Sequence, residues 1–151
     1  MILDTKLKWV VVADSNTCRI YNYRMRPEHF VLFKEINHPE NKLKDTDLTS
    51  DKPGRYIARD VGHGAYSQPS DPKEIKIDSF SREIARELDS GRVNNAYNEL
   101  IVVSPPHMNG LLFQHVNKHV KDLVAHVIEK DVVYLNDREL LTFLNENIYG
   151  E

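Results

Sequence analysis

The stretch that decides the fold is residues 98–116, NELIVVSPPHMNGLLFQHV. Leu100–Val103 is an unbroken apolar run of strand length. Ser104-Pro105-Pro106 stops it, because proline offers no N–H to a sheet ladder and biases the preceding residue away from helix. Apolar residues then resume at helical spacing from Met108 to Val116. A strand buried on both faces, a tight turn and a helix predict an α/β sheet, in which ligands usually sit in the loop after a strand.

Composition narrows the class of protein. A chain of 151 residues predicts one domain, residues 1–151, that buries a substantial core. The formal net charge of −3 argues mildly against a dedicated nucleic-acid binder but leaves room for a local basic face. No run reaches the roughly 18–20 apolar residues of a membrane span, so membrane insertion is not expected. The N-terminus lacks a secretory pattern, and the single cysteine, Cys18, excludes an internal disulfide, which suits a cytoplasmic protein.

Three strands open the chain. Lys8–Asp14, Cys18–Arg24 and His29–Asn37 are apolar or alternating runs separated by short turns, which predicts an antiparallel meander. An exposed edge at His29–Asn37 would be a candidate pairing surface, although the sequence does not determine the oligomeric state.

The segment from His38 to about Ile77 shows no sustained period, and prolines and glycines punctuate it throughout. A long loop of this kind is usually functional or disordered. Order returns at Asp78, a predicted N-cap for a helix that ends at Gly91. Phe80, Ile84 and Leu88 supply its apolar face.

The C-terminal third predicts one more strand and one more helix. Leu123–Glu129 is read as the strand, with a continued helix as the alternative, and Asn136-x-x-Glu139 as a capping box before a final helix. The element order β-β-β-α-β-α-β-α predicts a three-layer α/β/α architecture with a mixed five-stranded sheet and helices on both faces.

Five segments carry a resemblance to known proteins: WVVVADSNTCRIY at 9–21, DKPGR at 51–55, SDPKEIKIDSFSREIAREL at 70–88, LIVVSPPHMNGLL at 100–112 and VIEKDVVYLNDREL at 127–140. With this element order, the chain resembles the ribonuclease H-like architecture, which implies the strand order 3-2-1-4-5. Within that architecture it resembles the middle domain of archaeal and eukaryotic peptide release factors. It is most similar to the bacterial host attachment proteins, small single-domain relatives of that middle domain.

The long loop departs from the release-factor pattern. Release factors carry a Gly-Gly-Gln tripeptide there, whereas this loop reads Gly62-His63-Gly64-Ala65-Tyr66. Ala65 restricts the positive φ values that glycine permits, and Tyr66 has no side-chain amide. The resemblance therefore implies ancestry in the translation apparatus without the tripeptide of peptidyl-tRNA hydrolysis.

Nuclease chemistry needs several carboxylates around paired metals. Asp14 follows the first strand, but the fourth strand ends in Ser104 and two prolines, where a second acid would be needed. Glu83 and Glu87 fit the solvent face of their helix. Asp14 is therefore read as a turn residue.

Metal and thiol sites have weak support. His115 and His119 are four residues apart, a spacing that puts two imidazoles on one helical face, but the run HVNKH lacks the glutamate of zinc hydrolases. A structural zinc site is the alternative to surface histidines. Cys18 is read as a packing thiol. We therefore expect no catalytic residue, metal or cofactor.

Two binding regions remain. The loop mixes cations, aromatics and glycine, a combination that can hold phosphates and stack on bases, at Arg55, Tyr56, Arg59, His63, Gly64 and Tyr66. The turn after the fourth strand adds His107, Asn109 and Gly110 at a helix N-terminus, where an anion can bind. A solvated loop and simple capping are the alternatives for these two regions.

These patterns favour a non-catalytic binding protein that engages RNA, the ribosome or a protein partner through the long loop. The alternative is a divergent peptidyl-tRNA or phosphodiester hydrolase that uses the same loop or the strand ends. Any role in host attachment is expected to be indirect, because the N-terminus shows no export signal.

Overall fold

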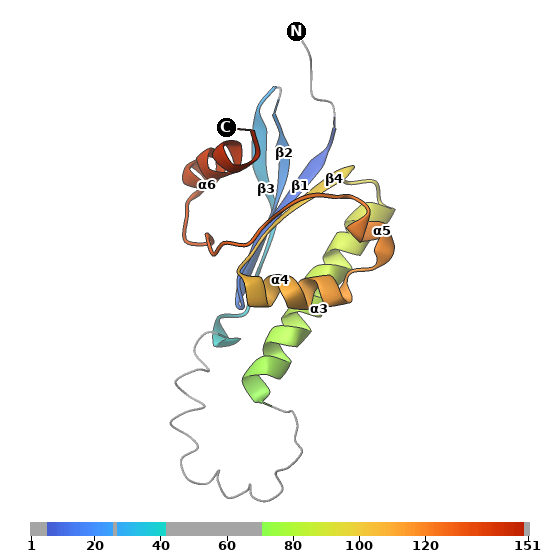
Figure 1. Ribbon diagram of the computed structural model, residues 1–151, viewed down its shortest axis with the longest axis vertical. Helices are drawn as coiled ribbons and strands as arrows, with labels where there is room; N and C mark the ends of the chain where they lie inside the picture. Colours follow the sequence, from blue (N-terminus) through green and yellow to red (C-terminus); the bar gives the residue numbers. More distant parts are fainter. Residues whose placement is uncertain (1–5, 26, 42–70, 150–151) are drawn as a thin grey trace, which may run out of the picture.

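The computed structural model describes residues 6–25, 27–41 and 71–149. Its centre is one five-stranded sheet in the order β3-β2-β1-β4-β5 (Figure 1). The strands are β1 (Lys8–Ala13), β2 (Thr17–Arg24), β3 (His29–Asn37), β4 (Glu99–Val103) and β5 (Val124–Ile128). The helices are α3 (Pro72–Val93), α4 (Pro106–His115), α5 (Lys118–Lys121) and α6 (Asp137–Leu144), which continues into a π-helical turn, η2 (Asn145–Tyr149).

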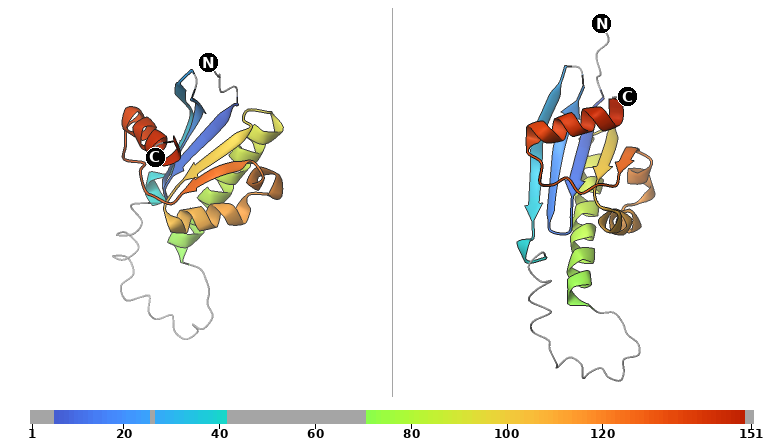
Figure 2. Two further views of the ribbon diagram at one scale, coloured as in Figure 1. Left: turned by 45° about the horizontal axis from the view of Figure 1, so that its top comes forward. Right: turned by 60° about the vertical axis from the view of Figure 1, so that its left-hand side comes forward.

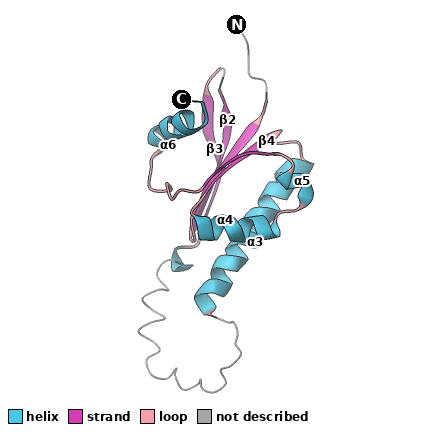
Figure 3. Ribbon diagram, viewed as in Figure 1, coloured by secondary structure: helices cyan, strands magenta, loops and turns pink. Residues whose placement is uncertain are grey.

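The strand directions follow from the connections. Short turns join β1 to β2 and β2 to β3, so both pairs are antiparallel. Helix α3 precedes β4, and α4 and α5 lie between β4 and β5 (Figure 3). With these crossovers, β4 runs parallel to β1 and β5 runs parallel to β4. The predicted mixed five-stranded sheet and its strand order are therefore confirmed.

Helices cover both faces of the sheet, as predicted. Along β1 the side chains alternate, so Trp9 and Val11 pack toward α3 while Val10 and Val12 pack toward α6. Figure 2 shows α6 on one face of the sheet and α3 with α4 on the other. None of the helices in the described ranges combines the length and apolarity that a bilayer crossing requires.

The start of α3 differs from the prediction. The helix begins at Pro72, and its N-cap is Asp71, whose side chain accepts a hydrogen bond of 2.9 Å from the Lys73 backbone N–H. Asp78, the predicted N-cap, lies inside the helix, so this prediction was wrong. The first turns leave Ile75 57% exposed, so the periodic apolar signal of a packed helix is missing there.

The end of α3 also differs. Gly91 does not end the helix, which continues to Val93 with its C-cap at Asn94. Gly91 is instead a packing position, because its backbone lies against the indole ring of Trp9.

Several local predictions are confirmed. The third strand is an edge of the sheet and exposes Val31, Leu32 and Phe33. The Asn136–Glu139 capping box is formed in both directions. Cys18 is a buried thiol in the core between β2 and α3.

Candidate binding site at the carboxyl edge of the sheet

β1, β3 and β4 run in the same direction, so their carboxyl ends meet at one edge of the sheet. This edge includes the turn after β1, residues 38–41 after β3, and the turn between β4 and α4. Segment 42–70 lies between the described residues Asn41 and Asp71. Ligands of open α/β sheets usually bind at this edge, which makes it the candidate site.

The turn after β1 is built on Asp14. One carboxylate oxygen, Oδ1, accepts hydrogen bonds from the backbone N–H groups of Asn16 at 2.9 Å and Thr17 at 2.8 Å. Hydrogen bonding of an Asp side chain to the backbone two and three residues ahead is a common way to stabilise a turn. The interpretation of Asp14 as a turn residue is confirmed.

A shallow cavity of about 300 Å³ lies beside this turn. Asp14 and Asn16 line one side, and Pro105, His107 and Met108 from the start of α4 line another. His107 is exposed, and its Nε2 lies 3.0 Å from a carboxylate oxygen of Glu74 on α3. Of the predicted strand-end residues, His107 is therefore the one that lines the cavity.

Asn109 and Gly110 lie differently. Asn109 is buried, its Oδ1 accepts from the Ser104 hydroxyl at 3.2 Å, and its Nδ2 donates to Glu129 at 3.1 Å. These bonds tie α4 to the ends of β4 and β5. Gly110 is exposed, and an added Cβ there would meet no heavy atom within 4 Å. A role for either residue in binding stays a prediction.

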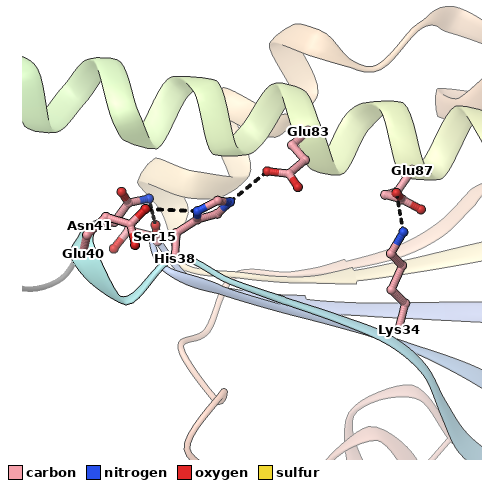
Figure 4. A network of polar contacts seen from close by, with 7 residues as sticks. All are labelled: Ser15, Lys34, His38, Glu40, Asn41, Glu83 and Glu87. Carbon is pink, nitrogen blue, oxygen red and sulfur yellow. Dashed lines mark hydrogen bonds and ion pairs between the residues drawn. The ribbon is translucent and has the colours of Figure 1, made fainter.

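His38 joins β3 to α3 at this edge (Figure 4). Its Nε2 lies 2.9 Å from Glu83 Oε1 and its Nδ1 lies 3.1 Å from Glu40 Oε2. A neutral imidazole has one N–H, so only the protonated ring can donate to both carboxylates. The hydrogen bond that His38 donates to Glu83 raises the pKa of His38 above its ordinary value.

The same network corrects the interpretation of Glu83 and Glu87. Both were expected on the solvent face of the helix, but they face β3, where Glu87 forms an ion pair of 2.7 Å with Lys34 (Figure 4). That prediction was wrong because Lys34 on β3 and His38 just after this strand supply two basic groups to this flank of the helix.

Asn41, the last described residue before segment 42–70, is held against the turn after β1. Its side-chain amide donates to the Ser15 carbonyl at 2.9 Å, and the His38 N–H donates to the Asn16 carbonyl at 2.7 Å. Sequence reasoning missed this anchor, because no local pattern links residues 15 and 41. The predicted loop residues Arg55, Tyr56, Arg59, His63, Gly64 and Tyr66 lie outside the described residues, and their role stays a prediction.

The alternative that His115 and His119 share one helical face is contradicted. α4 ends at His115, and His119 belongs to α5, so the two residues do not share a helix. His115 pairs with Asp78 instead, at 2.7 Å. Within residues 6–25, 27–41 and 71–149, no three His, Cys, Asp or Glu side chains are grouped to hold a metal ion.

Burial raises the pKa of the Cys18 thiol, so the thiolate is strongly disfavoured.

Known proteins with a similar fold were found among solved structures. An archaeal protein superposes with a TM-score of 0.51 at 9% identity, over 93% of this chain and 33% of that chain. Yeast (S. cerevisiae) Dom34, a translation termination-like factor, gives a TM-score of 0.37 at 11% identity, over 91% of this chain and 35% of that chain. The chain thus spans about a third of the length of these structures, and the archaeal likeness shows the fold alone.

Sequence comparison identifies the family. An uncharacterised protein of Rickettsia prowazekii (strain Madrid E) is 24% identical over 148 residues, covering 90% of this chain and 91% of the relative. A family model described as "Protein required for attachment to host cells" matches residues 9–144. Because this match covers most of the chain, the chain belongs to the family of proteins required for attachment to host cells.

Proposed function

We propose that this chain is a non-catalytic binding protein that engages RNA, or an RNA-containing assembly such as the ribosome, through its long loop and the turn between β4 and α4. The observation that supports this most is the position of the described residues at the start of the loop. His38 and Asn41, with which it begins, are held against the carboxyl edge of the sheet, beside the cavity that His107 lines.

The residues of the loop suit this ligand. Arg55 and Arg59 supply cations for phosphates, and Tyr56 and Tyr66 supply rings that can stack on bases. Arginine and aromatic side chains bind single-stranded RNA through these two contacts, with little need for a fixed sequence.

Three groups that could have supported chemistry have structural roles. Asp14 Oδ1 accepts two backbone hydrogen bonds, the Ser104 hydroxyl donates to Asn109, and the Cys18 thiol is buried and neutral. These roles support binding over hydrolysis for the described part of the chain. A contribution to host-cell attachment would then follow from what the chain binds.

Capture from native lysate tests the proposal. We expect the tagged chain to retain ribosomal particles or RNA, and we expect both to be lost after nuclease treatment or at high salt, because phosphate contacts are salt-dependent. The double variant R55E/R59E should lose the same material. Partners that survive RNA digestion would contradict RNA binding and favour a protein partner.

A second measurement separates binding from hydrolysis. We expect the unaltered chain to hydrolyse neither peptidyl-tRNA nor phosphodiester bonds, and we expect the same of variants substituted at Ala65 or Tyr66. A hydrolytic activity of the unaltered chain that collapses on these substitutions would overturn the non-catalytic proposal.

A further inference from the structure

A second polar surface lies away from the carboxyl edge, where the C-terminal half of α3 meets the junction of α4 and α5. An open groove of about 470 Å³ separates them. Arg82 and Arg86, one helical turn apart on α3, line it together with His115 and Asn117. Among the residues that line this groove, the one apolar side chain is that of Ala85.

Two acidic side chains, Asp89 in the lining of the groove and Asp78 beside it, are engaged by neighbours. Asp78 lies 2.7 Å from His115 Nε2 and 3.0 Å from Arg82 Nε. Asp89 accepts from the Asn117 amide at 2.8 Å and forms an ion pair of 2.9 Å with Arg92. These contacts lower the pKa of both carboxyl groups, so both are ionised and their charges are matched by adjacent donors.

The two arginines at the groove differ: Arg86 is available to a ligand as it stands, whereas Arg82 would have to leave Asp78 to His115. Arg86 is exposed and has no hydrogen bond or ion pair to any residue in the described ranges. The Arg82 side chain is 58% exposed in its pair with Asp78, and exposed ion pairs contribute little to stability. Its guanidinium can therefore turn toward a phosphate at small cost.

The other flank of α3 explains why positive charge remains here. Glu83 and Glu87 point toward β3, where His38 and Lys34 bind them (Figure 4). The acidic groups of this part of α3 are thus either on the far flank or already paired. A chain with an overall charge of −3 therefore presents a local basic groove.

We propose that this groove binds the phosphate backbone of single-stranded RNA, with Arg82 and Arg86 as the principal contacts. This inference rests on RNA being the ligand in the proposed function, but it uses a different surface from the long loop. Of the residues that line the groove, His115 alone carries a ring, and that ring is paired with Asp78, so the contacts of the groove are to phosphates and do not depend on base identity. A membrane surface fits less well, because peripheral binding needs an exposed apolar face beside the basic one.

The test is fluorescence anisotropy with a labelled oligouridylate of about 20 nucleotides, longer than the roughly 4–16 nucleotides that a small binding domain covers. The full chain is compared with R82E, with R86E and with the matched control R138E. Arg138 is exposed on α6, across the sheet from the groove, so the control makes the same charge change elsewhere. Circular dichroism of R82E checks that the loss of its Asp78 pair leaves the fold intact.

We expect R82E and R86E each to weaken binding about tenfold, as the loss of a charge-assisted contact would. Each should also reduce the slope of log K against log salt by about 0.7, the contribution of one phosphate contact on a single strand. R138E should bind with nearly the affinity and slope of the unaltered chain. Affinities of R86E and R138E that agree would overturn the groove proposal.

Comparison of R86E with R55E/R59E in the same assay distinguishes binding at the groove from binding at the long loop. If R55E/R59E abolishes binding while R86E does not, the groove proposal fails and the loop proposal stands. The reverse pattern supports the groove and contradicts the loop. No binding by the unaltered chain at about 50 mM salt would end both.

Two competitors identify other ligands. If uridine monophosphate displaces the RNA at equal phosphate concentration, the groove is a mononucleotide site, and the proposal that it binds the RNA backbone is overturned. If the chain binds no RNA but binds phosphatidylserine vesicles, and R86E abolishes the vesicle binding, the RNA proposal is overturned in favour of a membrane surface.

Discussion

The indole of Trp9 lies against the backbone of Gly91, so close that a Cβ on Gly91 would be 2.3 Å from the ring atom Cη2. The ring cannot move easily. It stacks on Tyr97 with centroids 4.8 Å apart, contacts Phe33 at 5.1 Å, and donates from Nε1 to Asn22 at 3.1 Å. This contact explains a glycine inside a long helix, where glycine is otherwise unfavourable.

Gly91→Ala should therefore lower the free energy of unfolding by about 1–3 kcal/mol, the usual cost of overpacking a core. The matched control is Gly110→Ala, in α4, where an added Cβ meets nothing within 4 Å. That change should raise the free energy of unfolding by about 0.5–1 kcal/mol, because alanine is the better helix former. Urea denaturation measures both, and a stabilising Gly91→Ala would contradict the packing argument.

The pairing of His38 with Glu83 should make stability depend on pH. The pKa of His38 is raised in the folded chain, so the contribution of the pair is fully present below the unfolded pKa of about 6.5. It is lost as the pH rises through the higher folded-state value. The pair is partly exposed, so its contribution should be about 0.2–1 kcal/mol.

Glu83→Gln should flatten this pH dependence, measured as the free energy of unfolding between about pH 5 and 8. Glu87→Gln is the matched control, because Glu87 is one turn further along α3 and pairs with Lys34 rather than His38. Equal slopes for the chain with and without Glu83 would show that the pair of His38 with Glu83 does not carry the effect.

Cys18 should resist thiol reagents in the folded chain. It is completely buried between β2 and α3, and burial raises the pKa of its thiol, so reaction requires unfolding. Labelling with an aromatic disulfide reagent should be about a thousand-fold or more slower than in urea, in proportion to the unfolded population. Rapid labelling of the native chain would indicate local opening of β2.

Two tyrosine hydroxyls attach the C-terminal helix to the sheet. Tyr21 donates to Asp137 at 2.8 Å, and Tyr23 donates to Asn145 at 2.8 Å. Replacement of either tyrosine by phenylalanine should lower the free energy of unfolding by about 0.5–1.5 kcal/mol and speed amide exchange in α6. Tyr134→Phe is the control, because Tyr134 is 77% exposed, and it should change neither quantity.

Asn109 should behave as a structural residue. Asn109→Ala leaves Ser104 and Glu129 without their amide partner and should cost about 1–3 kcal/mol in thermal unfolding. His107→Ala, two residues earlier on the exposed side of α4, should cost less than about 0.5 kcal/mol. Similar losses for both variants would contradict the assignment of Asn109 as the buried residue that ties α4 to the ends of β4 and β5.

Local pattern determined the elements and their order. The apolar runs at Lys8–Ala13 and Leu100–Val103, the proline stop after the second run and the capping box at Asn136 all act within a few residues, so each is readable from the sequence. Together with the family resemblance, they determined the sheet and its strand order.

The tertiary structure decided the features that depend on residues far apart in the chain. The first turns of α3 leave Ile75 exposed, so the sequence has no hydrophobic periodicity there that would mark the start of the helix at Pro72. Gly91 is explained by Trp9, and the side-chain contacts of Glu83 and His115 depend on His38 and Asp78. The reason is physical: hydrophobic periodicity reports burial along one element, whereas these contacts arise only when separate elements pack against each other.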